Sequence, residues 1–209
     1  MTLHLNRRGM IATVSASALA FATGARAQDK PLEPWQWTDR NGLIRDLPKD
    51  KEPLKDELKK YPRCRYCGME RAKFSHSRHL IVFEDDAVDG TCSLHCAAIG
   101  LSLNMDRGPK GLYAGDAGAD GDIKPLVSVD KAFYVIDASK PGTMTKVSNF
   151  AYADKSKAQA VAAAEASAKA GARVVDFNGA LREAYLNMAE DTIMVRGRRA
   201  ERRQKAQAK

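Results

Sequence analysis

The chain has 209 residues, of which 44% are apolar and 29% charged, so it can form one ordinary domain or two small ones, and wholesale disorder is not expected. Its formal charge of +8 is concentrated at the two ends: residues 1–27 carry about +3, residues 196–209 about +6, and the stretch between them about −1. Because the basic residues do not form a face of the central region, the composition argues against a nucleic-acid-binding domain.

Residues 1–27 have the pattern of an export signal. Arg7-Arg8 precede an Ala-rich apolar run from Met10 to Ala22, and residues 25–27 have the small-x-small pattern of a cleavage site. The paired arginines resemble a twin-arginine signal. A membrane span would need about 20 strongly apolar residues, and this run is short and rich in Ser, Thr and Ala. The sequence therefore predicts a periplasmic protein with no stable membrane anchor after processing.

A proline-rich extension over residues 28–61 precedes a first unit at residues 62–128. In this unit we expect a strand from His79 to Phe83 and a short second strand from Thr91 to Leu94. A helix from Leu94 to Leu103 should follow, with Ser93 as its N-cap. Residues 106–128 are rich in Gly and Asp and are expected to be a solvated connection.

A second unit is expected at residues 129–195, followed by a basic tail at residues 196–209 that extends or frays the last helix. The predicted strands are Ala132 to Ile136, Phe150 to Ala153 and Ala172 to Phe177. The predicted helices are an Ala-rich one over residues 155–170, stopped by Gly171, and a second one capped by Asn178. The predicted fold class is α+β, built from two small, similar strand-strand-helix units.

All four cysteines fall in two close pairs, Cys64-x2-Cys67 and Cys92-x3-Cys96, separated by 24 residues. Such pairs are typical of metal knuckles, because each can converge on one ion from a turn. The alternative is a pair of structural disulfides, which are common in exported proteins, and four cysteines allow three pairings. The spacing leaves both possibilities open.

The neighbouring residues bear on which metal would bind. Four thiolates alone favour a closed, structural zinc site. Met69 lies next to the first pair and adds a thioether, and a set of thiolate and thioether ligands favours Cu(I). His95 lies inside the second pair and is a further candidate ligand.

The segment from Cys64 to Met69, CRYCGM, is followed by an apolar strand and resembles the Cys-x-x-Cys-Gly-Met signature of the NosL family. Members of this family are periplasmic copper chaperones associated with assembly of the copper centres of nitrous oxide reductase. The second half, with a strand, Met144 and a helix-glycine-strand unit, is similar to the C-terminal half of that family. The resemblance covers about residues 62–187.

The resemblance implies a NosL-like fold, related to the organomercurial-lyase architecture, and Cu(I) held by Cys67, Met69 and Met144. Two features depart from the family pattern. Family members are typically lipoproteins, whereas no cysteine follows the apolar run here, and the pair formed by Cys92 and Cys96 looks like an addition.

The leading functional hypothesis is a Cu(I)-binding protein, not an enzyme, that delivers copper to a periplasmic cuproenzyme such as nitrous oxide reductase or exchanges it with a copper-transport component. The alternative is a periplasmic partner-binding protein that is stabilised by zinc or by disulfides. An organomercurial lyase or thiol oxidoreductase is the third possibility, and it has only fold-level analogy behind it.

Overall fold

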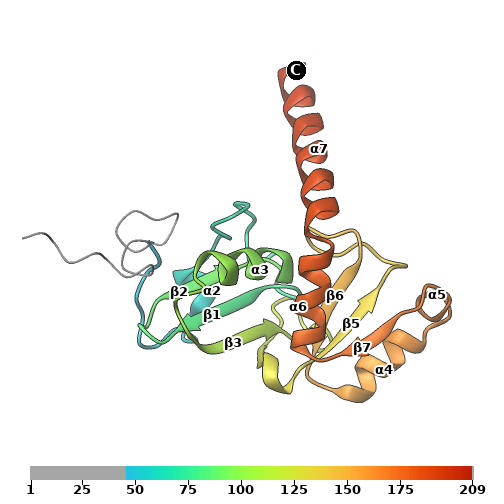
Figure 1. Cartoon of the computed structure of the whole chain (residues 1–209), viewed down its shortest axis with the longest axis horizontal. Helices are drawn as coiled ribbons and strands as arrows, with labels where there is room; N and C mark the ends of the chain where they lie inside the picture. The colour runs from blue at the N-terminus through green and yellow to red at the C-terminus, as the bar shows by residue number, and fades with distance from the viewer. Residues whose placement is uncertain (1–45, 209) are drawn as a thin grey trace, which may run out of the picture.

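The computed structural model describes residues 46–208. The expected export signal and most of the proline-rich extension lie outside this range. No helix within it has the length and apolar character needed to cross a bilayer. The described chain folds into two antiparallel sheets with helices packed on them, which confirms the α+β prediction (Figure 1).

The first sheet has four strands in the order β2-β1-β3-β4. They are β1 (His79–Phe83), β2 (Val88–Thr91), β3 (Pro109–Gly115) and β4 (Leu126–Ser128). Strand β1 is buried at every position because both of its faces are covered. Ile81 and Phe83 pack under helix α3 (Leu94–Leu103), whereas Leu80 packs against Tyr61, next to the short helix α2 (Glu57–Lys60).

The second sheet has three strands in the order β6-β5-β7, and successive residues alternate between two packed faces. The strands are β5 (Phe133–Asp137), β6 (Ser148–Tyr152) and β7 (Arg173–Val175). On one face Val135 packs against helix α4 (Lys155–Ala163), which is followed by the short α5 (Glu165–Lys169). On the other face Tyr134 and Ile136 pack against helix α6 (Phe177–Leu186).

One apolar core joins the two sheets. Leu94 and Ala98 of α3 share it with residues of β5 and with Ala180 and Ala184 of α6. Alanine at these positions lets the two helices approach closely. A parallel bridge between Asp116 and Ala151 adds a backbone link between the sheets. The short 3-10 helix η1 (Val129–Lys131) connects them along the chain.

Two predicted elements are confirmed in full: the strand from His79 to Phe83 and the helix from Leu94 to Leu103. Ser93 caps that helix as expected, because its hydroxyl accepts a hydrogen bond from the Cys96 N–H at 3.3 Å.

Other predictions need correction. Strands β3 and β4 occupy the stretch predicted to be a solvated loop, where pairing with β1 outweighs the low strand propensity of glycine. The second strand ends at Thr91, where the predicted strand begins. The Ala-rich helix is broken at Ala164 into α4 and α5. Helix α6 is capped by the Asp176 carboxylate instead of Asn178.

Helix α7 (Met188–Gln207) follows α6 after Asn187 and contains most of the basic tail, so the tail extends the last helix. Its N-terminal end lies on the body, and its C-terminal half projects away from it (Figure 1). Among the described residues it is the only element that projects in this way.

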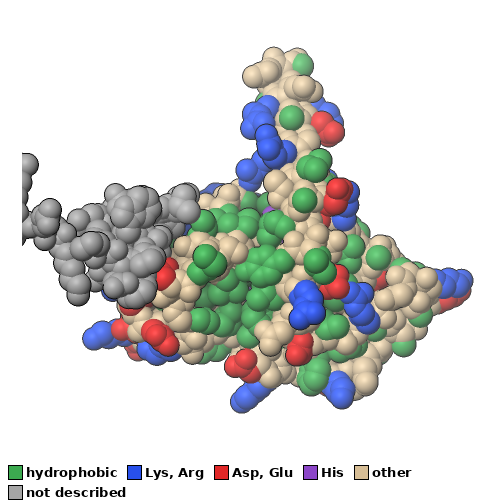
Figure 2. All heavy atoms as spheres, in the orientation of Figure 1, with side chains coloured by type: hydrophobic (Ala, Val, Ile, Leu, Met, Phe, Trp, Pro, Cys, Tyr) green, Lys and Arg blue, Asp and Glu red, His purple; other side chains and the backbone are tan. Residues whose placement is uncertain are grey.

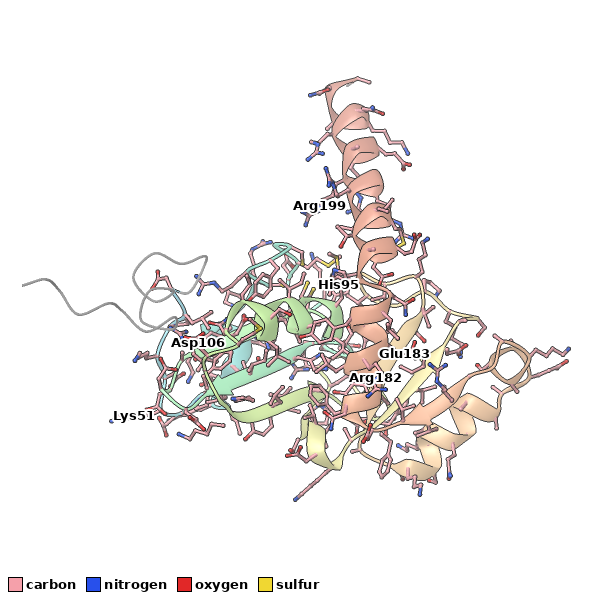
Figure 3. The ribbon with its side chains drawn as sticks, in the orientation of Figure 1. Lys51, His95, Asp106, Arg182, Glu183 and Arg199 are labelled. Atoms are coloured by element: carbon pink, nitrogen blue, oxygen red, sulfur yellow. The ribbon has the colours of Figure 1, made fainter. Side chains whose placement is uncertain are left out.

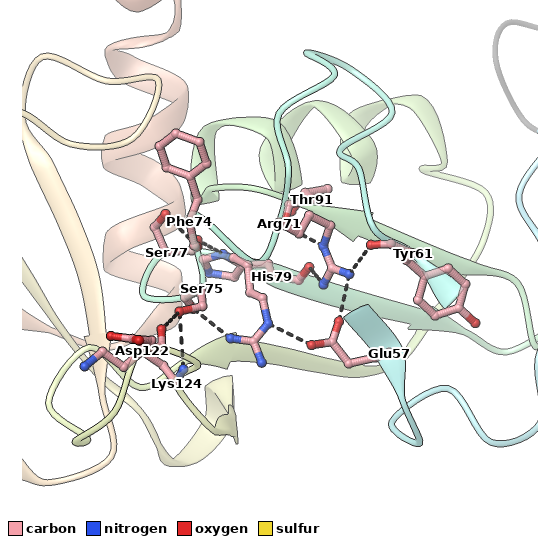
Figure 4. Close-up of polar contacts among 11 residues, drawn as sticks. Glu57, Tyr61, Arg71, Phe74, Ser75, Ser77, His79, Thr91, Asp122 and Lys124 are labelled. Atoms are coloured by element: carbon pink, nitrogen blue, oxygen red, sulfur yellow. Dashed lines mark hydrogen bonds and ion pairs between the residues drawn. The ribbon is translucent and has the colours of Figure 1, made fainter. Parts of the chain in front are cut away.

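A fully buried arginine organises the polypeptide that precedes the first cysteine (Figure 4). The Arg71 guanidinium donates to the backbone carbonyls of Tyr61, His79 and Thr91 at 2.7–3.1 Å. It also forms an ion pair with Glu57, 2.7 Å from nitrogen to oxygen, and the other carboxylate oxygen of Glu57 accepts a hydrogen bond from Arg78 at 2.8 Å. The free-energy cost of burying this charge is offset only if all of these partners keep their positions. Arg71 thereby fixes α2 and the following segment against β1 and β2.

His79 connects the two sheets through its side chain. Its Nδ1–H donates to the Ser77 carbonyl at 3.0 Å, because a carbonyl can only accept, and its Nε2 therefore accepts from the Tyr134 hydroxyl at 3.0 Å. This arrangement requires a neutral imidazole. Burial lowers the pKa of His79 from 6.5 to about 4.

We expect His79 to make the metal-free, reduced protein less stable in acid. The folded pKa lies below the unfolded value, so the stabilisation is complete above pH 6.5 and is lost as the pH falls towards 4, by about 3 kcal/mol in all. Urea unfolding across this range should show a steeper loss in the native protein than in His79→Gln, which does not titrate. His76→Gln, at a half-buried position, should remove a smaller part of the slope. Equal slopes in native and His79→Gln proteins would contradict the assignment.

Candidate metal centre

The first cysteine pair lies in a tight turn that brings its two ends together. The Cys64 N–H donates to the Met69 carbonyl at 2.9 Å, and the Cys64 carbonyl accepts from the Gly68 N–H at 2.8 Å. Gly68 has φ +77°, a left-handed conformation that glycine adopts without strain. A β-bridge between Arg63 and Glu70 closes the base of the turn. The local sequence thus forms a knuckle from which both thiols project to one side.

The second cysteine pair lies where β2 passes into helix α3. Cys92 follows the strand, and Cys96 is in the first turn of the helix, after the Ser93 cap. The free N–H groups and the dipole of a helix N-terminus favour negative charge there. The helix N-terminus therefore complements the charge that these two cysteines would carry once a cation has displaced their protons.

The two pairs meet in a single cluster. The four Sγ atoms lie within 4.8 Å of one another, with Cys92 Sγ 3.3 Å from Cys67 Sγ and 3.8 Å from Cys96 Sγ. None of the four cysteines forms a disulfide in the structure. Cys64, Cys92 and Cys96 are at most 1% exposed, and only Cys67 is partly exposed. The cluster therefore has three buried donors and one on its open side.

The thiols share protons unequally. Hydrogen bonds from Cys67, Cys92 and Cys96 hold the pKa of Cys64 well below its ordinary value. Donation to the Cys64 sulfur raises the pKa of Cys92 and of Cys96. The pKa of Cys67 is also lowered: donation to the Cys64 sulfur opposes this, but hydrogen bonds from Cys92 and Cys96 outweigh it. A bound cation would take over the role of the shared protons.

Two methionines pack against the cluster, Met69 from the turn and Met144 from the loop between β5 and β6, and both are partly exposed. Met144 has φ +66°, which is rare for a residue with a side chain. Its loop is fixed on both sides: Ser77 donates to the Thr143 hydroxyl at 2.8 Å, and Asp191 of α7 accepts from the Lys146 N–H at 2.8 Å. The two units of the fold thus both contribute sulfur atoms to this place.

His95 lies outside the four-sulfur group. It is buried, and its Nδ1 lies 3.7 Å from the Asp191 Oδ2 on α7 (Figure 3). The structure therefore brings together six of the seven predicted site residues, namely the four cysteines and the two methionines. The seventh, His95, contacts the base of α7.

One pair of site residues was not predicted from the sequence. The Tyr66 hydroxyl, within the first turn, donates to the carboxylate of Asp89 on β2, which is fully buried. A Cβ at Gly100 of α3 would lie 2.5 Å from that carboxylate and 2.9 Å from the Tyr66 hydroxyl. The pair thus fills the space that this glycine leaves. A glycine inside a helix was the available signal of such a close approach.

We expect Tyr66→Phe to lower the free energy of unfolding by about 1–3 kcal/mol, because it removes the one hydrogen bond that residues 46–208 give the buried Asp89 carboxylate. Since Tyr66 ties the first turn to β2, metal affinity should fall as well. Tyr113→Phe is a matched control, because no hydrogen bond to the Tyr113 hydroxyl is present among residues 46–208. Chemical unfolding of the reduced proteins measures the effect. Equal stability of the two variants would show that the hydrogen bond does not fix the turn.

Comparison with known proteins places the chain in a family. The sequence model of the NosL family matches residues 55–183, which is more than half of the chain. Among solved structures, the chain is similar to that titled the copper chaperone NosL from Shewanella denitrificans, at 20% identity and a TM-score of 0.44, over 56% of this chain and 87% of that chain. A search of curated proteins gave no match. On the extent of the family match, the chain belongs to the NosL family.

Proposed function

We propose that this protein binds Cu(I) at its sulfur cluster and passes the ion to a periplasmic copper-requiring protein, with nitrous oxide reductase as the first candidate. The observation that carries the proposal is the convergence of four thiols within 4.8 Å, with two thioethers packed beside them. Thiolates and thioethers are soft ligands, and soft ligand sets select Cu(I) over harder cations. The protein is a binding protein of the NosL family, not an enzyme.

Delivery requires that the ion can leave, and the cluster has one side from which it can. Cys67, Met69 and Met144 are partly exposed, whereas the other three sulfurs are buried. An incoming sulfur ligand can approach only on the exposed side. The thioethers are weak, neutral ligands that can be exchanged without proton transfer. We therefore assign the exposed residues to exchange and the buried cysteines to retention.

The remaining predictions fit this scheme but stay predictions. They are the twin-arginine export signal at residues 1–27 and the borders of the two units at residues 62–128 and 129–195. His95 is not included in the proposed ligand set, because it faces Asp191.

The test is a Cu(I) titration of the reduced protein against a competing chelator. Cys67→Ser combined with Met69→Leu should lower the affinity by more than the roughly 100-fold that loss of a supporting contact costs, because two direct ligands are removed. Met105→Leu is the matched control, since Met105 is 86% exposed. The circular dichroism of both variants should match the native protein. An unchanged titration of the double variant would eliminate the proposed ligand set.

A structural zinc site is the second candidate, and one distance favours it. Zinc–sulfur bonds of about 2.3 Å place the sulfurs of a tetrahedron about 3.8 Å apart, which is the separation of Cys92 and Cys96. Elemental analysis and thiol counting on freshly purified protein discriminate between the candidates. The copper proposal predicts four free thiols in the protein as purified, without a reducing step, and it predicts that added Cu(I) replaces any bound zinc. Stoichiometric zinc that resists this exchange, or two disulfides without metal, would favour a purely structural role.

A further inference from the structure

Helix α7 extends the site beyond the body of the protein. Its 20 residues form a rod about 30 Å long. The Arg199 guanidinium donates to the Cys67 carbonyl at 2.8 Å, and this is the last hydrogen bond from α7 to the body that the described residues show. Residues 200–207 continue past it into solvent (Figures 1 and 3). The projecting half of α7 therefore starts at the edge of the metal centre.

The projecting half is basic on one side. Helical periodicity places Arg196, Arg199 and Arg203 in one row, and a second, adjacent row holds Arg198, Arg202 and Lys205. All six side chains belong to exposed residues, and Figure 2 shows basic side chains along this part of α7. The opposite side holds small or neutral residues, namely Gly197, Ala200, Gln204 and Ala208. We call the six basic residues the basic face.

The basic face lacks partners within the chain. Apart from Arg199, its members form no ion pair or hydrogen bond from their side chains to any residue in the range 46–208. Glu201 is the one acidic residue from position 196 to position 208. Like charges at a spacing of three or four residues destabilise an isolated helix. Neutralisation by an external acidic surface would remove this cost.

The helix is poorly suited to insertion into a bilayer. An interfacial membrane helix needs a bulky apolar face opposite its charges. Ile193, Met194 and Val195 precede the basic face, but no bulky apolar residue follows them in α7. The observations therefore favour an acidic protein surface.

We propose that the basic face docks an acidic surface of the protein with which the cluster exchanges copper. Because Arg199 touches Cys67, a partner bound along the basic face holds its own sulfur ligands beside the exposed side of the cluster. Copper stays Cu(I) throughout. One bond from copper to the Cys67 sulfur breaks as one to an acceptor thiolate forms, the acceptor thiol gives its proton to solvent, and Cys67 takes one up. The proposal rests on the proposed function for its cargo.

The test compares Cu(I) transfer from the loaded full-length protein to two synthetic Cys-x-x-Cys peptides, one flanked by Glu and one by Gln. Native protein should transfer faster to the Glu peptide. In R202Q/R203Q/K205Q the ratio of the two rates should fall about tenfold, as expected when steering charges are removed, and salt near 1 M should abolish the preference. Arg199 is left intact because it contacts Cys67 in the first cysteine turn. K131Q/K155Q/K169Q removes three exposed charges elsewhere and should keep the native ratio.

Cu(I) affinity, measured before acceptor is added, should be equal in all three proteins. An unchanged ratio in the α7 variant, or an equal fall in the control variant, would overturn the docking proposal. Binding to phosphatidylglycerol vesicles that depends on Arg202, Arg203 and Lys205, without a peptide preference, would overturn it in favour of lipid. If native protein binds no Cu(I), the proposed function fails separately. In that case, binding of the Glu peptide to metal-free protein is measured by fluorescence anisotropy. The absence of salt-sensitive binding would overturn the docking proposal.

Discussion

Four sulfur atoms from two turns, 24 residues apart in the sequence, share a space 4.8 Å across, and much of the first unit serves to hold them there. Thiols in such proximity repel one another once they ionise, so the turns must be fixed by other interactions until a cation binds. Arg71 supplies one of these by tying the segment before Cys64 to β1 and β2. Tyr66 supplies another through the Asp89 carboxylate. Both act on the first turn, because Cys92 and Cys96 are already fixed by β2 and α3.

The buried charges also explain why the site depends on the whole fold. Arg71 and Glu57 are desolvated, and a buried ion pair contributes little net stability while making the arrangement highly specific for one geometry. His79 joins the strand that Arg71 contacts to Tyr134 in the second sheet. The loop that carries Met144 is fixed in turn by Ser77, two residues before His79, and by Asp191 of α7. Residues of both sheets and of the last helix are thus coupled to the same cluster.

The sequence predicted the parts of this arrangement that are local. The run HLIVF is a strand because five consecutive apolar or aromatic-like residues suit a strand buried on both faces. Ser93 caps helix α3 because its hydroxyl bonds the backbone N–H of Cys96, three residues further along the chain. The spacing of the two cysteine pairs favoured convergence on one ion but left disulfides open, and the family resemblance gave only Cys67, Met69 and Met144 as ligands. What the sequence could not reveal depends on distant partners. The composition of β3 is that of a glycine-rich loop, and it forms a strand because it pairs with β1. Asp176 is the cap of α6 instead of Asn178 because the preceding strand ends earlier than its composition suggests.

The backbone at Met144 bears on whether the cluster only stabilises the fold or also exchanges its metal. A left-handed conformation costs a residue with a side chain about 1–2 kcal/mol, and a methionine needed merely to fill a gap could do so from an unstrained loop. Strain of this kind persists where surrounding contacts enforce it, and it is concentrated at functional sites. A closed zinc site is already four-coordinate with four cysteines, so a thioether at its edge would not be a ligand. A site that retains an ion with three buried sulfurs and releases it on the side of Cys67 would use such a thioether, because an incoming ligand can replace a neutral one there.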